Sequence, residues 1–381
     1  MKEAPRRIGK AERNARLDRL RELMGEAGVD AVLLGPTSSL RYFTGIVWHP
    51  SERFTGALVH AGGGIDYICP RFELEKVSEL VSIPGEIHTW EEEESPAKLV
   101  AKRLPKTAKL GLDDLMQLFF YVALRREFAD RRLVDAGPMI NVLRRVKSPA
   151  ELALMKHAKA VTLQVHKRAW ECMKSGVKTS EVRRFIDAQH RAAGSDGGNT
   201  FCIVSFGEDT CLPHGGEGDR ALKSGDVILI DTGCSFDGYN SDITRTYVFG
   251  KPSKRVREVW ALEKEAQAAA FAAAKIGRPC EVVDAAARDV LLRAGLGPDY
   301  RLPGLPHRTG HGIGLDVHEA PNLVRGDKTP LAAGMCFSNE PMVVIPGEFG
   351  IRLEDHFYMT KAGPRWFTEP SHSIDEPFAG V

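Results

Sequence analysis

The hydrophobic positions near the N-terminus repeat with the period of a helix. Between residues 10 and 28 they place Leu17, Leu20, Met24 and Ala27 on one face, which predicts an amphipathic helix. Short apolar runs follow at residues 31–34, 57–60, 67–69, 109–112 and 133–135, each of strand length. Three glycines at residues 62–64 are typical of a hairpin turn, and the acidic run at residues 91–94 is typical of a solvated face. Residues 1–147 are therefore predicted to form an α/β domain.

A helix-start signal marks the boundary of a second domain, residues 148–381. Ser148 precedes Pro149 at the first helical position and Glu151 at the third, the pattern of a capping box. A helical pattern then continues to residue 174 and is stopped by Gly176. A chain of 381 residues also exceeds what one hydrophobic core usually organises. Two domains follow from both observations.

The second domain contains an internal duplication. Leu222-x-x-Gly225 is followed by Asp231, and Leu331-x-x-Gly334 is followed by Glu340 at the same spacing. Each copy has an upstream histidine, a downstream acid and a preceding helical segment; these are His214 and His318, Asp242 and Glu354, and residues 181–194 and 281–295. The repeat predicts two α+β halves related by a pseudo-twofold axis, with equivalent residues meeting at a central sheet.

The second domain places acids where strands are predicted. Asp231 ends the apolar run 227–230, and glycines between residues 233 and 238 can turn the chain so that Asp242 lies on the neighbouring antiparallel strand. Glu340 follows one strand-like run, and Glu354 lies within another at residues 351–358. Any one of these acids could be a strand-end cap or half of a buried salt bridge. Four together repel one another unless cations lie between them, which favours a pair of divalent metals.

His311 adds an imidazole to these four acids. It lies in the glycine-rich stretch Thr309-Gly-His-Gly-Ile-Gly314, where it could be a ligand or a structural loop histidine. Four carboxylates and one imidazole suit manganese, cobalt, iron or zinc. Two such ions can share a water, lower its pKa and stabilise a hydrolytic displacement. The residues alone therefore predict metal-dependent hydrolysis.

Composition and missing motifs argue against several other classes of function. Lys and Arg number 52 against 51 Asp and Glu, so no net basic field attracts nucleic acid. Residues 1–21 lack the apolar core of a signal peptide, and no apolar run approaches membrane-spanning length, which predicts a cytoplasmic protein. Seven scattered cysteines without a CxxC pair indicate reduced thiols. Motifs of P-loop proteins, zincins and serine hydrolases are missing.

These motifs together resemble the pita-bread metallopeptidases, over essentially the whole chain. The resemblance rests on Asp231-Thr-Gly, Ser241-Asp242-Ile-Thr-Arg-Thr, Gly310-His311-Gly-Ile-Gly, Asn339-Glu340-Pro341 and Arg352-Leu-Glu354-Asp355. It implies a creatinase/prolidase-like N-terminal domain before the pita-bread catalytic domain. The close relatives are the Xaa-Pro dipeptidases (prolidases), which hydrolyse the bond before proline, and the Xaa-Pro aminopeptidases, which act on longer peptides.

The resemblance also implies roles for individual residues. Asp231 would bind one divalent ion, Asp242 and Glu354 would bridge two, and His311 and Glu340 would bind the second. Manganese is the expected metal, with cobalt or zinc as alternatives.

Other site residues are implied in the same way. His214 and His318 would steady the substrate carbonyl and the developing oxyanion. His307 would line the pocket, Arg352 would pair with the acids, and Thr244 would support Asp242 from the same strand.

Two departures from the family pattern concern the substrate. Asn322 stands where several dipeptidases carry an arginine that binds the substrate carboxylate, and Phe236 stands where many relatives carry tyrosine. Arg325 is the nearest replacement cation, unless it is a solvated loop residue. Trp48, in the segment ending at Phe54, could extend into a neighbouring subunit of a homodimer or could simply pack against its own chain.

The departures weaken the dipeptidase prediction relative to the aminopeptidase alternative but leave hydrolysis intact. A non-catalytic pita-bread module that binds peptides is a further alternative, although such proteins typically lose metal ligands. Creatinase shares the architecture without this ligand set, and methionine aminopeptidase lacks the N-terminal domain. Proline-containing peptides are the expected partners, with neither nucleic acid nor membrane.

Overall fold

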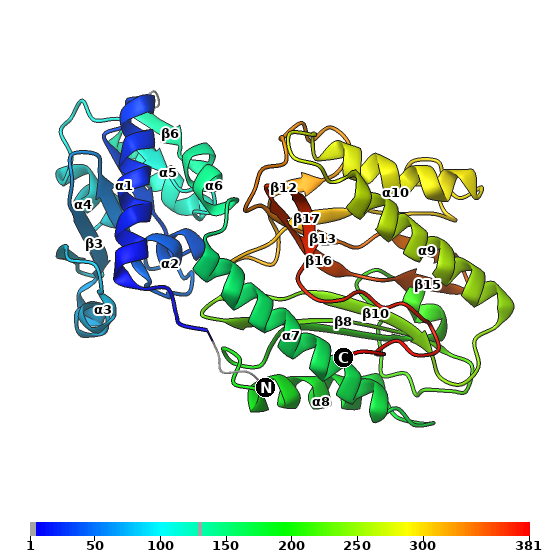
Figure 1. Cartoon of the computed structure of the whole chain (residues 1–381). Coiled ribbons are helices and arrows are strands. Elements are labelled where there is room, and N and C mark those ends of the chain that lie inside the picture. Colours follow the sequence, from blue (N-terminus) through cyan, green and yellow to red (C-terminus); the bar gives the residue numbers. More distant parts are fainter. Residues whose placement is uncertain (1–4, 129–131) are drawn as a thin grey trace. The chain divides into compact units, whose positions relative to one another are not determined.

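The computed structural model describes residues 5–128 and 132–381, which form two compact units (Figure 1). One unit comprises residues 8–144, and the other comprises residues 145–381 together with the segment before residue 8. Within the described part of the chain, no helix combines the length and the apolar character needed to cross a membrane.

The N-terminal unit is built on a six-stranded mixed sheet. Its order is β4-β3-β2-β1-β5-β6, with β1–β2 and β2–β3 antiparallel and the other neighbours parallel. The strands are β1 (Ala31–Leu34), β2 (Gly56–His60), β3 (Ile65–Pro70), β4 (Glu86–Trp90), β5 (Leu110–Leu112) and β6 (Leu133–Asp135). The helices are α1 (Lys10–Ala27), α2 (Ser38–Thr44), α3 (Leu74–Leu80), α4 (Pro96–Lys102), α5 (Leu118–Glu127) and α6 (Gly137–Arg144), with a 3-10 turn at Arg71–Glu73. The predicted strands and the hairpin after β2 are confirmed.

Helix α1 confirms the amphipathic pattern except at its end. Leu17, Leu20 and Met24 are buried, but Ala27 is exposed, so its assignment to the buried face was wrong. The reason is that α1 ends at Ala27, and Gly28 caps it in the left-handed region at φ 62°. The last residue therefore lies beyond the core that the preceding turns cover.

The first helix of the C-terminal unit, α7 (Pro149–Glu171), begins as the sequence predicts. The Glu151 backbone N–H donates to Ser148 Oγ at 3.2 Å, and the Ser148 N–H donates to Glu151 Oε2 at 2.8 Å, which completes the capping box. The helix ends three residues earlier than the pattern indicated, with Cys172 as its C-cap.

Two sheets carry the duplication of the C-terminal unit. The first has the order β10-β8-β7 with β9 paired to β8, and the second has the order β12-β11-β13-β16-β17. Strands β7 (Asn199–Phe206), β8 (Val227–Phe236), β9 (Tyr239–Asn240) and β10 (Ile243–Val248) form the first sheet. Strands β11 (Gly310–Gly312), β12 (Glu319–Leu323), β13 (Cys336–Asn339), β16 (Asp355–Thr360) and β17 (Gly363–Trp366) form the second. Since β8 lies between β7 and β10 as β13 lies between β11 and β16, the two halves match. An isolated antiparallel bridge between Thr244 and Glu354 joins them.

Helices and a hairpin complete this unit. Helix α8 (Thr179–Ala192) accompanies α7, and α9 (Lys254–Ala273) packs against α10 (Glu281–Arg293), so that the strands lie between the two helix pairs (Figure 1). The hairpin consists of β14 (Met342–Ile345) and β15 (Phe349–Arg352), and a 3-10 turn spans Gly207–Cys211.

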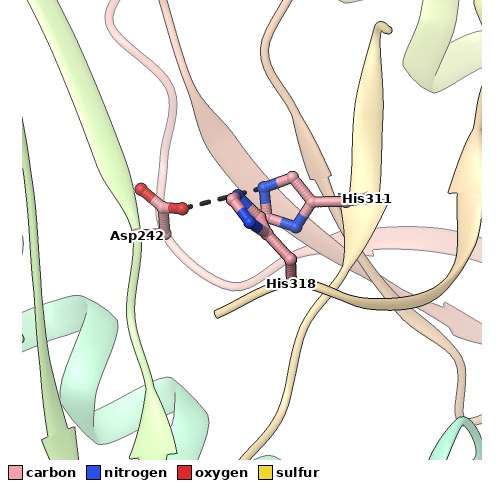
Figure 2. Close-up of side chains that lie close together, drawn as sticks. All are labelled: Asp242, His311 and His318. Carbon is pink, nitrogen blue, oxygen red and sulfur yellow. Dashed lines mark ion pairs between the residues drawn. The ribbon is translucent and has the colours of Figure 1, made fainter. Parts of the chain in front are cut away.

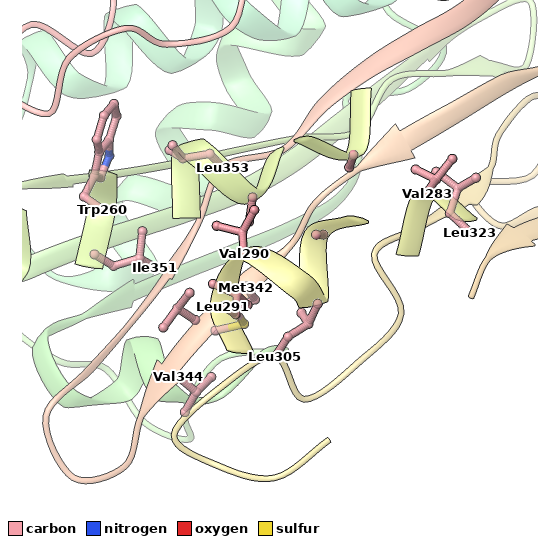
Figure 3. Close-up of a cluster of buried hydrophobic side chains, with 14 of the residues drawn as sticks. Trp260, Val283, Val290, Leu291, Leu305, Leu323, Met342, Val344, Ile351 and Leu353 are labelled. Atoms are coloured by element: carbon pink, nitrogen blue, oxygen red, sulfur yellow. The ribbon is translucent and has the colours of Figure 1, made fainter. Parts of the chain in front are cut away.

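A large hydrophobic core lies between α9, α10 and the β14–β15 hairpin. Trp260 of α9 and Val290 of α10 lie beside Met342 and Ile351, all of them buried (Figure 3). This apolar packing fixes the backbone immediately before Glu354. A rigid core thus supports one of the predicted metal ligands.

The turn between the two aspartates is shorter than expected. Gly233 lies inside β8, and the chain turns at Asp237 and Gly238, whose φ angles are 48° and 77°. Gly233 is required for another reason, because a Cβ there would lie 1.9 Å from the Ser241 carbonyl oxygen on the returning chain. The single strand expected at residues 351–358 is likewise wrong: Leu353 and Glu354 separate β15 from β16.

Gly233→Ala is expected to destabilise the C-terminal unit. The added methyl must displace a backbone carbonyl, and overpacking of this kind costs about 1–3 kcal/mol or more. Gly25→Ala is the control, because a Cβ at Gly25 in α1 meets nothing within 4 Å. This substitution should stabilise the helix by about 0.5–1 kcal/mol. Thermal unfolding measures both. Equal midpoints for Gly233→Ala and the wild type would contradict the strand assignment.

Candidate metal centre

A cavity of about 590 Å³ in the C-terminal unit collects most of the predicted site residues. Its walls include every predicted metal ligand, all three predicted pocket histidines and Arg352. The lining residues are Phe201, Ile203, Pro213, His214, Asp231, Asp242, Pro306, His307, Arg308, His311, Val317, His318, Glu340, Arg352 and Glu354. Both halves of the duplication contribute.

Backbone pairing brings the acids together. Asp231 lies in β8 directly opposite Thr244 of β10, and Asp242 lies immediately before β10. Thr244 forms the bridge to Glu354, which places the two halves' second acids beside each other. Glu340 follows β13, whose last residue pairs with the first residue of β16. Four acids far apart in sequence thus converge because two sheets meet at one point.

Arg352 and Thr244 hold two of these acids in place. The Arg352 guanidinium donates from Nη2 to Asp231 Oδ2 at 2.7 Å and from Nε to Thr244 Oγ1 at 3.1 Å. The Thr244 hydroxyl donates in turn to Glu354 Oε2 at 2.8 Å. All four side chains are buried, so one oxygen of each carboxylate is fixed and the other is left for a different partner.

His311 presents one ring nitrogen to the acids. Its Nδ1 lies 2.9 Å from the Gly312 carbonyl oxygen, to which it donates when protonated there. Its Nε2 then faces Glu340 Oε1 at 3.0 Å. The same nitrogen lies 3.7 Å from Asp242 Oδ2 (Figure 2). Fixing the proton on Nδ1 leaves the Nε2 lone pair for a ligand, as in metal-binding histidines.

Unpaired carboxylate oxygens show that this donor set fits cations. Asp231 Oδ1, Asp242 Oδ1 and Glu354 Oε1 are buried without a hydrogen-bond partner among the residues that the structure describes. Burial, together with the charges of the neighbouring acids, raises the pKa of Asp242 and of Glu354 well above the usual range. Several buried carboxylates without partners are costly, and coordination of divalent cations removes that cost. The carboxylate and imidazole atoms lie close enough to share ions.

Three further histidines surround the acids. The His318 ring lies edge-on to that of His311, with centroids 4.2 Å apart (Figure 2). Part of the His318 ring is exposed at the cavity mouth, while burial of the remainder and the nearby His311 and Arg308 lower its pKa to about 4. His214 is also exposed at the mouth. His307 donates from Nδ1 to the Arg308 carbonyl, and burial lowers its pKa.

The predicted substrate contacts do not line this cavity. Phe236 is buried against the His157 ring at 4.5 Å between centroids, because the turn carries it away from Asp231. Asn322 lies opposite His311 on β12, and its backbone N–H donates to Asp327. Arg325 is exposed, pairs with Asp299 and lines a different cavity beneath α10. None of these three residues is among those that line the cavity of the acids.

Trp48 lies in the N-terminal unit, in the irregular segment between α2 and β2. The Lys76 ammonium lies 5.0 Å from its ring centroid, a cation–π contact within its own chain. Trp48 thus contacts its own chain, and its role toward a neighbouring subunit stays a prediction.

Sequence reasoning missed Arg308. It follows His307 in the chain and lines the cavity, half-buried. Over residues 5–128 and 132–381, no ion pair or side-chain hydrogen bond engages its guanidinium. Its only signal in the sequence was its place beside His307, and that could not show which way the side chain points.

The fold and the cavity define a hydrolase-type centre of converging carboxylates and one histidine. Residues 153–361 match Metallopeptidase family M24, and residues 16–146 match the Creatinase/Prolidase N-terminal domain. The chain belongs to metallopeptidase family M24 and is a metallopeptidase, with a creatinase-like domain before the pita-bread catalytic domain.

Individual relatives extend over almost the whole chain. The Xaa-Pro dipeptidase of Lactobacillus helveticus is 33% identical over 366 residues, which are 94% of this chain and 98% of that protein. The crystal structure of dipeptidase PepE from Mycobacterium ulcerans superposes with a TM-score of 0.90 at 34% identity, covering 97% of this chain and 98% of that one. The recombinant prolidase from Thermococcus sibiricus gives 0.87 at 31% identity, covering 96% and 99%.

Proposed function

We propose that this protein is a divalent-metal-dependent Xaa-Pro dipeptidase, which hydrolyses the peptide bond before a C-terminal proline. The observation that carries the proposal is the convergence of unpaired carboxylate oxygens with the Nε2 atom of His311 inside one cavity. The relatives that are named dipeptidase or prolidase support the substrate class.

The five ligands are proposed to hold two ions. Asp231 would bind one ion, His311 and Glu340 the other, and Asp242 and Glu354 both. Manganese suits a site rich in carboxylates with a single imidazole, and cobalt or zinc are alternatives. Bound divalent ions of this kind polarise a carbonyl oxygen and lower the pKa of water.

The chain's own residues are proposed to position the substrate around that centre. His318, with a pKa of about 4, stays neutral at neutral pH and can donate an N–H to the carbonyl oxygen of the bond to be cleaved. His214 shares the cavity mouth and is proposed to assist. Phe201, Ile203 and Val317 supply an apolar wall against which the side chains of the substrate can pack.

Arg308 is proposed to bind the free carboxylate of the dipeptide. A dipeptidase must recognise this group, because it alone distinguishes a dipeptide from a longer chain. Arg352 also lines the cavity, but its guanidinium is already bonded to Asp231 and Thr244. Arg308 carries a cationic guanidinium with no ionic partner within the described part of the chain. Guanidinium groups bind carboxylates with paired, charge-assisted hydrogen bonds.

Arg308→Ala should raise KM for Xaa-Pro dipeptides by about 10- to 150-fold. The expected loss is that of a charge-assisted hydrogen bond, about 1.5–3 kcal/mol. Arg325→Ala is the matched control and should change KM little, because Arg325 pairs with Asp299 in another cavity. Amidation of the substrate carboxylate should slow the wild type strongly and Arg308→Ala hardly at all.

The same substrate panel tests the function itself. Wild-type turnover should be high for Xaa-Pro dipeptides and low for longer Xaa-Pro peptides. Equal turnover of the two would instead favour an Xaa-Pro aminopeptidase, and no turnover of either by the manganese-loaded protein would favour a binding module.

We further propose a cytoplasmic homodimer, with domains at residues 1–147 and 148–381. All seven cysteines are free thiols, which suits a reducing compartment and supports the location. Light scattering of the purified protein measures the number of chains in solution.

A further inference from the structure

Three neighbouring strands of the N-terminal sheet bring two histidines and two acids together. Asp66 of β3 pairs with Glu86 of β4, and two residues further along His88 pairs with Ile68. Side chains two residues apart on a strand share a face, so Asp66, Glu86 and His88 project to the same side. His60, the last residue of β2, reaches the same carboxylate.

The two distances from the His88 nitrogen to the acids fit a tetrahedral metal site, and all three candidate ligand atoms lie within 4.8 Å of one another. His88 Nε2 lies 3.4 Å from Asp66 Oδ1 and 3.4 Å from Glu86 Oε2. Metal–ligand bonds of about 2.0–2.2 Å in a tetrahedron separate neighbouring ligands by about 3.3–3.6 Å. An N–H···O hydrogen bond is shorter, about 2.7–3.2 Å.

The His88 Nε2 atom at the centre of this group is buried and takes part in no hydrogen bond within the described part of the chain. Buried ring nitrogens normally have a partner. The Glu86 side chain is 74% exposed, so an ion and its water can reach the group from solvent.

Asp66 is held by its other oxygen. His60 Nε2 and Arg103 Nε lie 3.0 Å and 2.9 Å from Asp66 Oδ2. Burial opposes ionisation, but Arg103 and His60 hold the pKa of Asp66 below its usual value, so it is a carboxylate at neutral pH. Hydrogen bonds to the second oxygen orient ligating carboxylates in metal sites in this way. Arg103 also reaches Glu86, with Nη2 lying 3.5 Å from Oε2, and its charge offsets one of the two negative charges.

We propose that Asp66 Oδ1, Glu86 and His88 bind one divalent transition-metal ion, of the class of Zn²⁺, with solvent in the fourth position. One imidazole with two carboxylates favours such borderline ions over Mg²⁺. The ligands come from β3 and β4, so the ion would tie the outer strand of the sheet to its neighbour. The site lies wholly within residues 8–144, whereas the catalytic acids belong to residues 145–381.

Metal content of the full-length protein tests this site. Wild type, His88→Gln and His372→Gln are loaded with Mn²⁺, dialysed against micromolar Zn²⁺, and total metal per chain is measured by mass spectrometry. His372 is the matched control, because it forms an exposed pair with Glu369 at 2.9 Å and pairs with no second acid among the described residues. Wild type and His372→Gln should hold about one ion more than His88→Gln, with peptidase activity equal in all three. Equal metal content in wild type and His88→Gln would overturn the proposal.

A second variant covers the case in which His88→Gln fails to fold. Glu86→Gln changes an exposed side chain and should raise the dissociation constant for the additional Zn²⁺ by at least about tenfold. An unchanged constant would overturn the proposal and leave these residues as an ion-pair cluster. Mg²⁺ in place of Zn²⁺ should give no additional equivalent.

Discussion

Glu354→Gln is expected to lower peptidase activity by at least about 10³-fold and to reduce the metal content of the C-terminal unit. Glu354 is 1% exposed, lies where the two sheets meet, and keeps Oε1 unpaired while Oε2 accepts from Thr244. Loss of one hydrogen-bond donor in an active site already costs about 10²–10³ in rate. Loss of a ligand proposed to serve both ions should exceed that. Activity with Xaa-Pro dipeptides and metal content by mass spectrometry measure the two effects.

The stability of this variant should change in opposite directions with and without metal. In metal-free protein, Glu354→Gln removes a buried acid that the charges of Glu340 and Asp231 oppose, so the thermal midpoint should rise. In manganese-loaded protein the midpoint should fall, since ligand binding stabilises the folded state.

Glu263→Gln is the matched control for Glu354→Gln. Glu263 is fully buried, and burial raises its pKa well above the usual range, but it accepts from the Leu353 N–H and does not line the cavity. It should keep both metal and activity. Full activity of Glu354→Gln, or of wild type shown to be free of metal, would contradict a two-ion centre.

His318→Ala should lower kcat by about 10²–10³ while the metal content stays at the wild-type level. The ring stands beside His311 at the cavity mouth, and its pKa of about 4 keeps it a neutral donor across the neutral range. The loss should therefore appear in kcat at pH 7 rather than as a shifted pH optimum. Steady-state kinetics and metal analysis of the same preparation separate the two effects.

Two comparisons sharpen this experiment. His318→Gln retains an N–H donor and should recover part of the lost rate. His372→Gln, at an exposed histidine outside the cavity, should behave as wild type. His318 also lies within ligand distance of Asp242 and His311. Loss of metal from His318→Ala would therefore show that His318 is a ligand and would contradict the role proposed for it.

Local signals in the sequence determined much of the secondary structure and the identity of the converging acids. The capping box at Ser148 and Glu151 acts within one helical turn, so it was readable without tertiary information. The repeated spacing before Asp231 and Glu340 was likewise visible, and it corresponds to equivalent strands in the two sheets. The short apolar runs at residues 31–34, 57–60 and 67–69 were also readable locally, and they lie in β1, β2 and β3 of the N-terminal sheet.

Only the tertiary structure decided which side chains face the cavity. Arg325 and Arg308 carry the same side chain, yet Arg308 lines the cavity and Arg325 pairs with Asp299 elsewhere, since loop direction depends on contacts distant in sequence. Gly233 reads as a turn residue, but the close approach of the Ser241 carbonyl holds it in a strand. The meeting of Thr244 and Glu354 joins two sheets across a long sequence separation. Contacts of that kind depend on how whole elements pack, which local periodicity does not encode.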